Sequence, residues 1–381
     1  MRFNEKSLVV FVAGLLVAAV AAALVWSLLL RDDDDTASDP AAAANAASSL
    51  EGGPPEILLL SGTTLVRRNV EEQTEELLAD IPSPSVYPAP GSSWLAYVTS
   101  KDAEAGEDFA AEPVLHLYDV ATEDKAGYGA GVAPVWNPAG THVAFLRPVE
   151  PRSCTGETCP GNVQIGLVEA ATGRESLLLE PGRYTILGWA GEWVLVSDFD
   201  NPTQVISVSR DDERKTLDMP ASQLWGASPD GSWVIKTNAK KTEFVSMVDG
   251  ELGDERIEVD LGGYRLLEGA WAHDSARVAA VVSNESSVEK GKGKRTRSVD
   301  QDPSSRIVVF SPGDPEPVVV DGSFGATGTV LWTVDNESVV FTNLLDPKKA
   351  LFQAKTCSLG NPSDCKIVTS WTEGVVLLRA E

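Results

Sequence analysis

Four cysteines in two closely spaced pairs are the first residues of this sequence whose type and spacing point to a chemistry. Cys154 lies close to Cys159, and Cys357 lies close to Cys365. In an oxidising compartment each pair can close a local loop, so the spacing predicts two disulfides. A zinc site built from all four thiolates is the alternative, but such sites usually contain cysteines separated by two residues, a spacing that is missing here.

A cluster of cations stands out in an otherwise acidic chain, which carries 56 Asp plus Glu against 31 Lys plus Arg. The cluster consists of Lys290, Lys292, Lys294, Arg295 and Arg297. It predicts either a solvated, flexible loop or a docking site for an anionic partner, such as a protein or lipid headgroups. The acidic balance of the whole chain argues against nucleic acid as a partner, because phosphate binding depends on clustered cations.

Groups suited to acid–base or metal chemistry form no specific pattern. His116 lies in an alternating strand pattern, and His142 and His273 lie in or beside turns, so we expect structural or exposed roles for them. Carboxylate pairs such as Asp198 and Asp200 are expected by chance at this acidity, and no Gly-x-Ser-x-Gly motif is present. We therefore predict no catalytic residue and no cofactor. A calcium ion held by loop carboxylates is conceivable, although the sequence has no Asp-x-Asp-x-Asp-Gly run.

The N-terminal region predicts a single membrane-spanning helix. Arg2 and Lys6 lie in residues 1–7, and residues 8–30 contain no charge. An apolar helix of this length can cross a hydrocarbon core about 30 Å thick. Because cations precede the span and an acidic run follows it, residues 1–7 are expected in the cytoplasm and the rest of the chain outside. Residues 31–55, acidic and then rich in Ala, predict a disordered linker, and a cleaved signal peptide is the alternative to the anchor.

Residues 56–381 predict an all-β domain built from a repeat. Its clearest copy is WNPAGTHVAF at residues 136–145, an aromatic residue followed by a tight turn and an apolar strand. Short apolar segments separated by Gly, Pro, Asp or Asn are typical of β-hairpins. Gly91, Gly140 and Gly231 are expected at turn positions where φ is positive.

The positions that begin the repeats are expected to pack one blade of a propeller against the next. They are Tyr87, Trp136, Trp189, Ala227, Trp271 and Trp332. Their spacing is that of four-stranded propeller blades. Because Ala227 stands where the other repeats have an aromatic residue, one contact between blades should be built differently.

Two segments that the repeats leave over predict a further blade. Residues 56–60, 64–68 and 76–78 resemble the last three strands of a blade, and residues 375–378 form a lone strand pattern near the other end of the sequence. Joining them closes the ring and removes open sheet edges. The prediction is therefore a seven-bladed β-propeller, with a six-bladed ring and extra edge strands as the alternative.

The repeats resemble those of TolB-like β-propellers, a WD-like repeat family whose motif is similar to W-S-P-D-G-x-x-I-A-F. NPAGTHVAF at residues 137–145 and SPDGSWVI at residues 228–235 carry the resemblance best. It implies a propeller and an extracytoplasmic binding role, here in a membrane-anchored variant. It transfers no catalytic residue.

Long loops between the second and third strands of a blade indicate where binding is placed. They are predicted at residues 101–112, 148–162 and 284–304. Since loops on a rigid scaffold often carry binding specificity, we predict a membrane-anchored, extracytoplasmic module that binds a protein partner or ligand at the cell envelope, or assists assembly there. The alternative is an extracytoplasmic hydrolase or lyase that uses carboxylates or a metal in the central channel.

Overall fold

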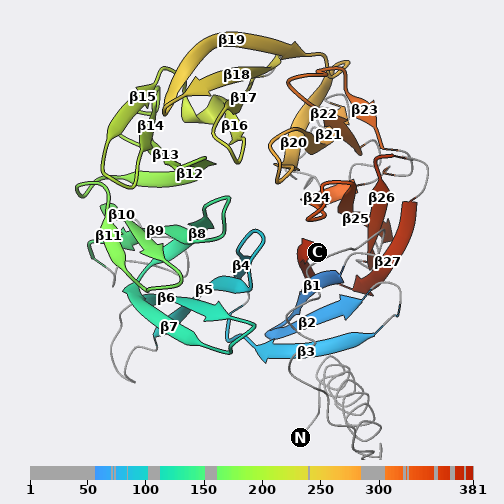
Figure 1. The fold of residues 1–381 in the computed structure, drawn as a ribbon, viewed down its shortest axis with the longest axis horizontal. Coiled ribbons are helices and arrows are strands. Elements are labelled where there is room, and N and C mark those ends of the chain that lie inside the picture. The colour runs from blue at the N-terminus through green and yellow to red at the C-terminus, as the bar shows by residue number, and fades with distance from the viewer. Residues whose placement is uncertain are drawn as a thin grey trace, which may run out of the picture. The chain divides into compact units, whose positions relative to one another are not determined.

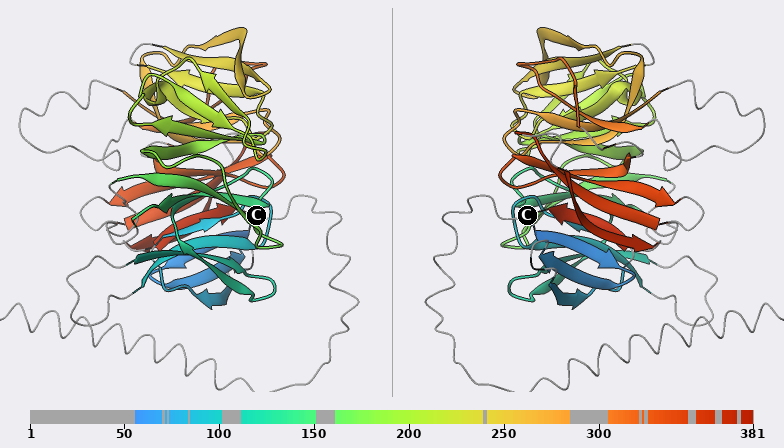
Figure 2. Two further views of the ribbon diagram at one scale, coloured as in Figure 1. Left: turned by 90° about the vertical axis from the view of Figure 1, so that its left-hand side faces the viewer. Right: turned by 90° about the vertical axis from the view of Figure 1, so that its right-hand side faces the viewer.

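The computed structural model describes a ring of seven four-stranded antiparallel sheets (Figure 1). The described residues are 56–69, 72, 74–83, 85–101, 112–150, 161–238, 241–284, 305–320, 323, 326–346, 351–360, 365–372 and 375–380. In each sheet one end strand lies nearest the centre of the ring and the other lies outside, and the strands run between the two faces (Figure 2). The all-β, seven-bladed prediction is confirmed, and the six-bladed alternative is wrong.

The blades are named in chain order, each from its inner to its outer strand. Blade 1 is β4 (Val86–Pro88), β5 (Trp94–Lys101), β6 (Glu112–Asp119) and β7 (Lys125–Ala130), and blade 2 is β8 (Val132–Trp136), β9 (His142–Pro148), β10 (Val163–Glu169) and β11 (Glu175–Leu177). Blade 3 is β12 (Tyr184–Ala190), β13 (Trp193–Asp198), β14 (Val205–Val208) and β15 (Arg214–Leu217). A short 3₁₀ helix, η2 (Ala221–Gln223), leads into blade 4, which is β16 (Leu224–Ala227), β17 (Trp233–Thr237), β18 (Thr242–Val248) and β19 (Glu251–Val259).

The remaining blades complete the ring. Blade 5 is β20 (Tyr264–Trp271), β21 (Val278–Asn284), β22 (Arg306–Phe310) and β23 (Val318–Val319). Blade 6 is β24 (Ala326–Trp332), β25 (Ser338–Asp346), β26 (Leu351–Ser358) and β27 (Cys365–Thr372). Blade 7 is β28 (Val375–Ala380), β1 (Glu56–Ser61), β2 (Thr64–Asn69) and β3 (Glu75–Asp80).

Blade 7 is assembled from segments at the two ends of the folded unit. Its inner strand β28 pairs antiparallel with β1, so that Ile57 lies opposite Ala380 and Ser61 opposite Val375. The sheet then continues from β1 to β2 and from β2 to β3. The sequence predicts that residues 56–60 and residues 375–378 belong to one blade, and this prediction is confirmed.

The hairpin between the first and second strands repeats its hydrogen bonds from blade to blade. In blade 2 the N–H of Asn137 donates to the carbonyl of His142 at 2.9 Å, and the N–H of Gly140 donates to the carbonyl of Asn137 at 3.0 Å. Equivalent bonds close the hairpins of blades 4, 5 and 6. The turn residues with positive φ include Gly91 (60°), Gly140 (65°), Gly231 (76°), Ser275 (62°) and Asn336 (60°). The three glycines are as predicted, whereas Ser275 is not, because serine rarely adopts this conformation.

Indole N–H groups connect the inner strands of neighbouring blades. Trp136 donates to the carbonyl of Tyr87 at 2.8 Å, Trp189 donates to the carbonyl of Val135 at 3.0 Å, and Trp332 donates to the carbonyl of Ala270 at 2.8 Å. All three tryptophans are buried. Their role is therefore packing between blades, as the repeat predicts.

The residues equivalent to Ala227 bond to the preceding blade, so Ala227 predicts a different contact between blades 3 and 4, where it packs in a hydrophobic cluster with Ala190 and Leu195 and supplies no indole. The contact between blades 4 and 5 is also built differently, which the sequence did not predict. Trp225, which precedes Ala227 in β16, donates its indole N–H to the carbonyl of Leu267 in β20 at 2.9 Å. This bond runs from blade 4 to the following blade, whereas the others run to the preceding one. Trp271 occupies the expected position in β20, but its buried indole N–H has no hydrogen-bond partner among the described residues.

One assigned position requires a correction. In blade 1 Pro88 pairs with Leu95 in the same way that Trp136 pairs with Val143, so Pro88 and not Tyr87 begins the hairpin. The two turns differ in length before their glycine: Gly91 is the second residue after Ala89, whereas Gly140 is the third after Asn137. The sequence pattern alone does not distinguish these two turns, so the assignment was displaced by one residue.

The predictions for residues 1–7, 8–30 and 31–55 fall outside the described residues. Within the part of the chain that the structure describes, none of the helical segments has the length and apolar character required to cross a membrane.

Candidate functional site

The cation cluster and the first cysteine pair lie outside the described residues. The cluster falls within residues 285–304, and Cys154 and Cys159 fall within residues 151–160. The flanking strands are described: the three predicted loops connect β5 to β6, β9 to β10 and β21 to β22. Because each loop joins the second strand of a blade to the third, all three leave the ring from the same face.

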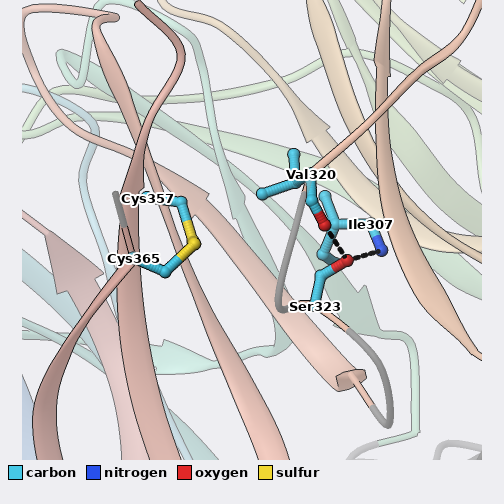
Figure 3. The surroundings of a disulfide bond; sticks show 5 residues. All are labelled: Ile307, Val320, Ser323, Cys357 and Cys365. Carbon is cyan, nitrogen blue, oxygen red and sulfur yellow. Dashed lines mark hydrogen bonds between the residues drawn. A yellow bond between two sulfur atoms is a disulfide. The ribbon is translucent and has the colours of Figure 1, made fainter. Parts of the chain in front are cut away.

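The second cysteine pair forms a disulfide inside the contact between blades 5 and 6. Cys357 in β26 lies opposite Cys365 in β27, and the two are bonded (Figure 3). Cys357 is fully buried and belongs to the same hydrophobic cluster as Ile307 and Val320. Nearby, the hydroxyl of buried Ser323 donates to the carbonyl of Val320 at 2.6 Å and accepts from the N–H of Ile307 at 2.9 Å. The bond excludes the zinc alternative, which requires all four thiolates.

The histidine with the most contacts is His116 in β6. Its ring stacks on Tyr97 with the ring centres 5.0 Å apart, and its Nε2 lies 2.8 Å from the hydroxyl of Thr99. Burial, and secondly the charge of Lys125, lower the pKa of His116. Burial is also the first cause that lowers the pKa of His142. These are the surroundings of structural residues, and no group of three or more His, Cys, Asp or Glu among the described residues could hold a metal ion.

A cavity of about 430 Å³ opens between the inner strands of blades 4, 5 and 6, which lie nearest the centre of the ring (Figure 1). Its lining consists of Leu224, Trp225, Leu267, Glu268, Gly269, Thr329 and Val330. Glu268 is the single carboxylate among these described lining residues. The described lining of this cavity therefore contains no pair of carboxylates.

A second cavity, of about 490 Å³, lies at the outer part of the contact between blades 4 and 5. Its apolar lining comes from Val282 in β21, Val308 in β22, Val319 in β23 and Leu261 in the connection between the blades. Val282 and Val308 also belong to the hydrophobic core between these blades. The outer strand β23 pairs with β22 over two residues, and the N–H of Val320 beyond it donates to the carbonyl of Ile307 at 3.0 Å, so the chain covers β22 back to the residue after Arg306.

Arg306, the first residue of β22, is the cationic group of this second cavity. Its guanidinium carbon lies 4.1 Å from the ring centre of Tyr264, a stacking contact that fixes the orientation of the guanidinium plane. The Nε atom of Arg306 is buried and has no hydrogen-bond partner among the described residues. A buried donor without a partner is unfavourable, so Arg306 offers a hydrogen bond that a bound acceptor would satisfy.

Three carboxylates line the same cavity and make its charge negative overall. Glu258, at the end of β19, lies 3.3 Å from the ammonium of Lys241. Asp260 accepts the backbone N–H of Gly262 at 2.8 Å, and Glu316 is exposed to solvent. The cavity thus combines an apolar surface, one oriented guanidinium and an acidic rim.

Sequence reasoning missed Arg306 and Tyr264, although one signal was available. The strand RIVVF alternates in the sheet, so Arg306 shares a side with Val308, which faces the core between blades. A cation at a core position of a strand is unusual and indicates a specific role. The meeting of residues 258–262 with residues 315–319, which line the cavity, has no comparable signal in the sequence.

The fold defines the class of protein: a seven-bladed β-propeller closed by a blade that contains both ends of the folded unit. No protein-family model matches the sequence, and no curated protein matches it either.

Solved propeller structures are similar to this chain at low sequence identity. A putative 6-phosphogluconolactonase from Bacteroides fragilis NCTC 9343 is 10% identical, with a TM-score of 0.50 over 88% of this chain and 99% of that one. The acylaminoacyl peptidase of Pyrococcus horikoshii is 12% identical, with a TM-score of 0.50 over 81% of this chain and 48% of that one. TolB from Acinetobacter baumannii is 12% identical, with a TM-score of 0.46 over 88% of this chain and 69% of that one. Such similarity concerns the fold alone.

Proposed function

We propose that this protein is a membrane-anchored, extracytoplasmic β-propeller that binds a protein partner and acts as an assembly module at the cell envelope. The observation that carries the proposal is the closed ring, from one face of which three long connections leave blades 1, 2 and 5. Binding specificity is commonly placed on loops that a rigid scaffold holds in position.

Two further observations support the location. The disulfide between Cys357 and Cys365 is of the kind that forms in oxidising compartments outside the cytoplasm. The uncharged residues 8–30, preceded by Arg2 and Lys6, have the pattern of an anchor with its N-terminus in the cytoplasm.

The cation cluster is the expected contact with the partner. Its charge is opposite to that of the chain as a whole, which has a formal net charge of −25. An anionic patch on the partner would be attracted to the cluster and repelled by most of the remaining surface, and this difference orients docking. The hydrolase or lyase alternative gains no support from the inner cavity, whose lining contains Glu268 as its single carboxylate among the described residues.

The test uses the full-length protein in intact cells, with chemical crosslinking followed by identification of co-purified proteins. One variant replaces the cluster residues Lys290, Lys292, Lys294, Arg295 and Arg297 by Gln. A matched control replaces the same number of exposed cations elsewhere by Gln, namely Arg174, Arg183, Arg210, Arg256 and Lys366.

The partner should be lost from the cluster variant and retained by the control. Equal recovery with both variants would refute docking through the cluster. The location is tested separately by protease treatment of intact cells, where protection of the propeller would contradict an extracytoplasmic domain.

A further inference from the structure

We infer that the cavity between blades 4 and 5 is a second binding site, which goes beyond the cation cluster and takes a cationic peptide segment with an apolar side chain. The cavity of about 490 Å³ is within the range of roughly 300 to 1,000 Å³ typical of ligand sites. Three chemically different surfaces meet in it, and each sets one requirement for the ligand.

The first requirement is an apolar group. Val282, Val308 and Val319 come from three adjacent strands of blade 5 and line the cavity together with Leu261. Val282 and Val308 are buried and form the floor, whereas Leu261, Pro315, Pro317 and Val319 are partly exposed, so an aliphatic side chain placed on these four removes apolar surface from water on both partners. A purely polar ligand would leave this surface uncovered.

The second requirement is a hydrogen-bond acceptor. The Nε of Arg306 is buried without a partner among the described residues, and stacking on Tyr264 holds the guanidinium in place. Because the side chain is already oriented, little rotamer entropy is lost when an acceptor binds. A main-chain carbonyl of a peptide supplies such an acceptor.

The third requirement is positive charge. Glu258, Asp260 and Glu316 line the cavity, whereas Arg306 is the single cation among the described lining residues. An anionic ligand would be attracted by one guanidinium and repelled by Asp260 and Glu316, whereas Glu258 is paired with Lys241. Lysine or arginine side chains of a ligand would instead pair with Asp260 and Glu316, which are exposed at the rim.

A peptide meets these requirements together. It presents a carbonyl, an aliphatic side chain and a basic side chain within a few residues, whereas a polyamine has no acceptor and a fatty acid has no cation. The site is therefore assigned to a short basic and apolar segment of a partner protein.

The test measures binding of a fluorescein-labelled peptide, acetyl-Lys-Leu-Lys-Leu-Lys-amide, to the full-length protein in detergent by fluorescence anisotropy at low salt. Two comparison peptides replace either every Lys by Glu or every Leu by Ser. The variants are Arg306→Met and the double variant Asp260→Asn with Glu316→Gln. Controls are Arg183→Met in blade 3 and Glu337→Gln in blade 6, both exposed.

The Lys/Leu peptide should bind, and the Glu/Leu peptide should not. Arg306→Met should weaken binding about tenfold or more, because a charged donor is lost from a desolvated contact. The double variant should weaken binding at least about threefold, and added salt should reduce this difference. Both control variants should bind as the wild type does.

Equal binding of the Lys/Leu peptide to the wild type and to the double variant would overturn the inference, as would equal binding of the Lys/Ser and Lys/Leu peptides. Since Asp260 and Glu316 are exposed, the double variant tests the site even if Arg306→Met does not fold. Peptide anisotropy and recovery of the envelope partner are separate readouts, so this site and the proposed docking cluster can fail independently.

Discussion

Trp271 and Trp332 allow the hydrogen bond between blades to be measured by comparison. Both lie in inner strands of neighbouring blades and at equivalent steps of the repeat. Trp332 is buried and donates to the carbonyl of Ala270 at 2.8 Å. The indole N–H of Trp271 is buried but has no partner among the described residues. Replacement of each by Phe removes the N–H and part of the aromatic ring, so the two variants differ mainly in the bond that is lost.

The expected magnitudes follow from that difference. The smaller ring loses about 1 kcal/mol of apolar burial in a fully buried site. In Trp332→Phe the carbonyl of Ala270 also loses its donor, which is unfavourable by about 1 to 3 kcal/mol, so the free energy of unfolding should fall by about 2 to 4 kcal/mol. In Trp271→Phe the lost burial is offset by removal of an unpaired donor, and the net change should stay within about 1 kcal/mol of zero.

Urea unfolding followed by far-ultraviolet circular dichroism is the suitable assay, because the chain contains ten tryptophans and intrinsic fluorescence would not report one site. The midpoint of Trp332→Phe should lie clearly below that of the wild type, and the midpoint of Trp271→Phe should lie close to it. Equal shifts of the two midpoints would refute the assigned role of the indole bond.

Three further predictions concern the turn, the disulfide and pH. Gly140 and Gly91 have similar positive φ, but a Cβ on Gly140 would lie 2.2 Å from a carbonyl oxygen of blade 1, whereas one on Gly91 meets nothing within 4 Å. Gly91→Ala should therefore lower the free energy of unfolding by about 1 to 2 kcal/mol and Gly140→Ala by clearly more, and equal melting temperatures would contradict the clash. Replacing Cys357 and Cys365 together by Ala should lower the free energy of unfolding by about 2 to 3 kcal/mol. Dithiothreitol should lower it more in the wild type than in this variant, because only the wild type has this bond to lose. The pKa of His116 is lowered from 6.5 in the folded state, so near and below pH 6.5 the unfolded chain binds more protons than the folded one. The contribution of His116 to the free energy of unfolding should therefore be fully present above pH 6.5 and decrease as the pH falls. His116→Gln should reduce the change of the urea midpoint with pH.

The periodicity of the chain was sufficient to predict the blades. The strands expected around Trp136 correspond to β8, β9, β10 and β11, and the pairing of residues 56–60 with residues 375–378 follows from two incomplete patterns that complement each other. Ala227 also predicted a contact between blades 3 and 4 without an indole, whereas the bond from Trp225 to blade 5 was not predicted. These inferences succeeded because turn glycines and apolar alternation are local properties of the sequence.

The second cavity could not be predicted in this way. It lies where residues 258–262 meet residues 315–319, and Arg306 stacks there on Tyr264, from which the third loop separates it in the sequence. Both facts depend on how two blades meet and not on a local pattern. The disulfide between Cys357 and Cys365 was predictable because its partners are near in sequence, whereas the outcome for Cys154, Cys159 and the cation cluster lies outside the described residues.

The pairing of β28 with β1 makes closure of the ring depend on contact between segments far apart in the sequence. Ile57 lies opposite Ala380, so the seventh sheet cannot form until the segment around residue 380 is available. Pairing over such a sequence separation is slow, because loop-closure entropy is lost before the contacts form. A product that ends before β28 would keep β1 as an unpaired edge, the type of surface that associates with other chains. The strand β28 thus both closes the ring and covers the edge of β1 that a chain without it would expose.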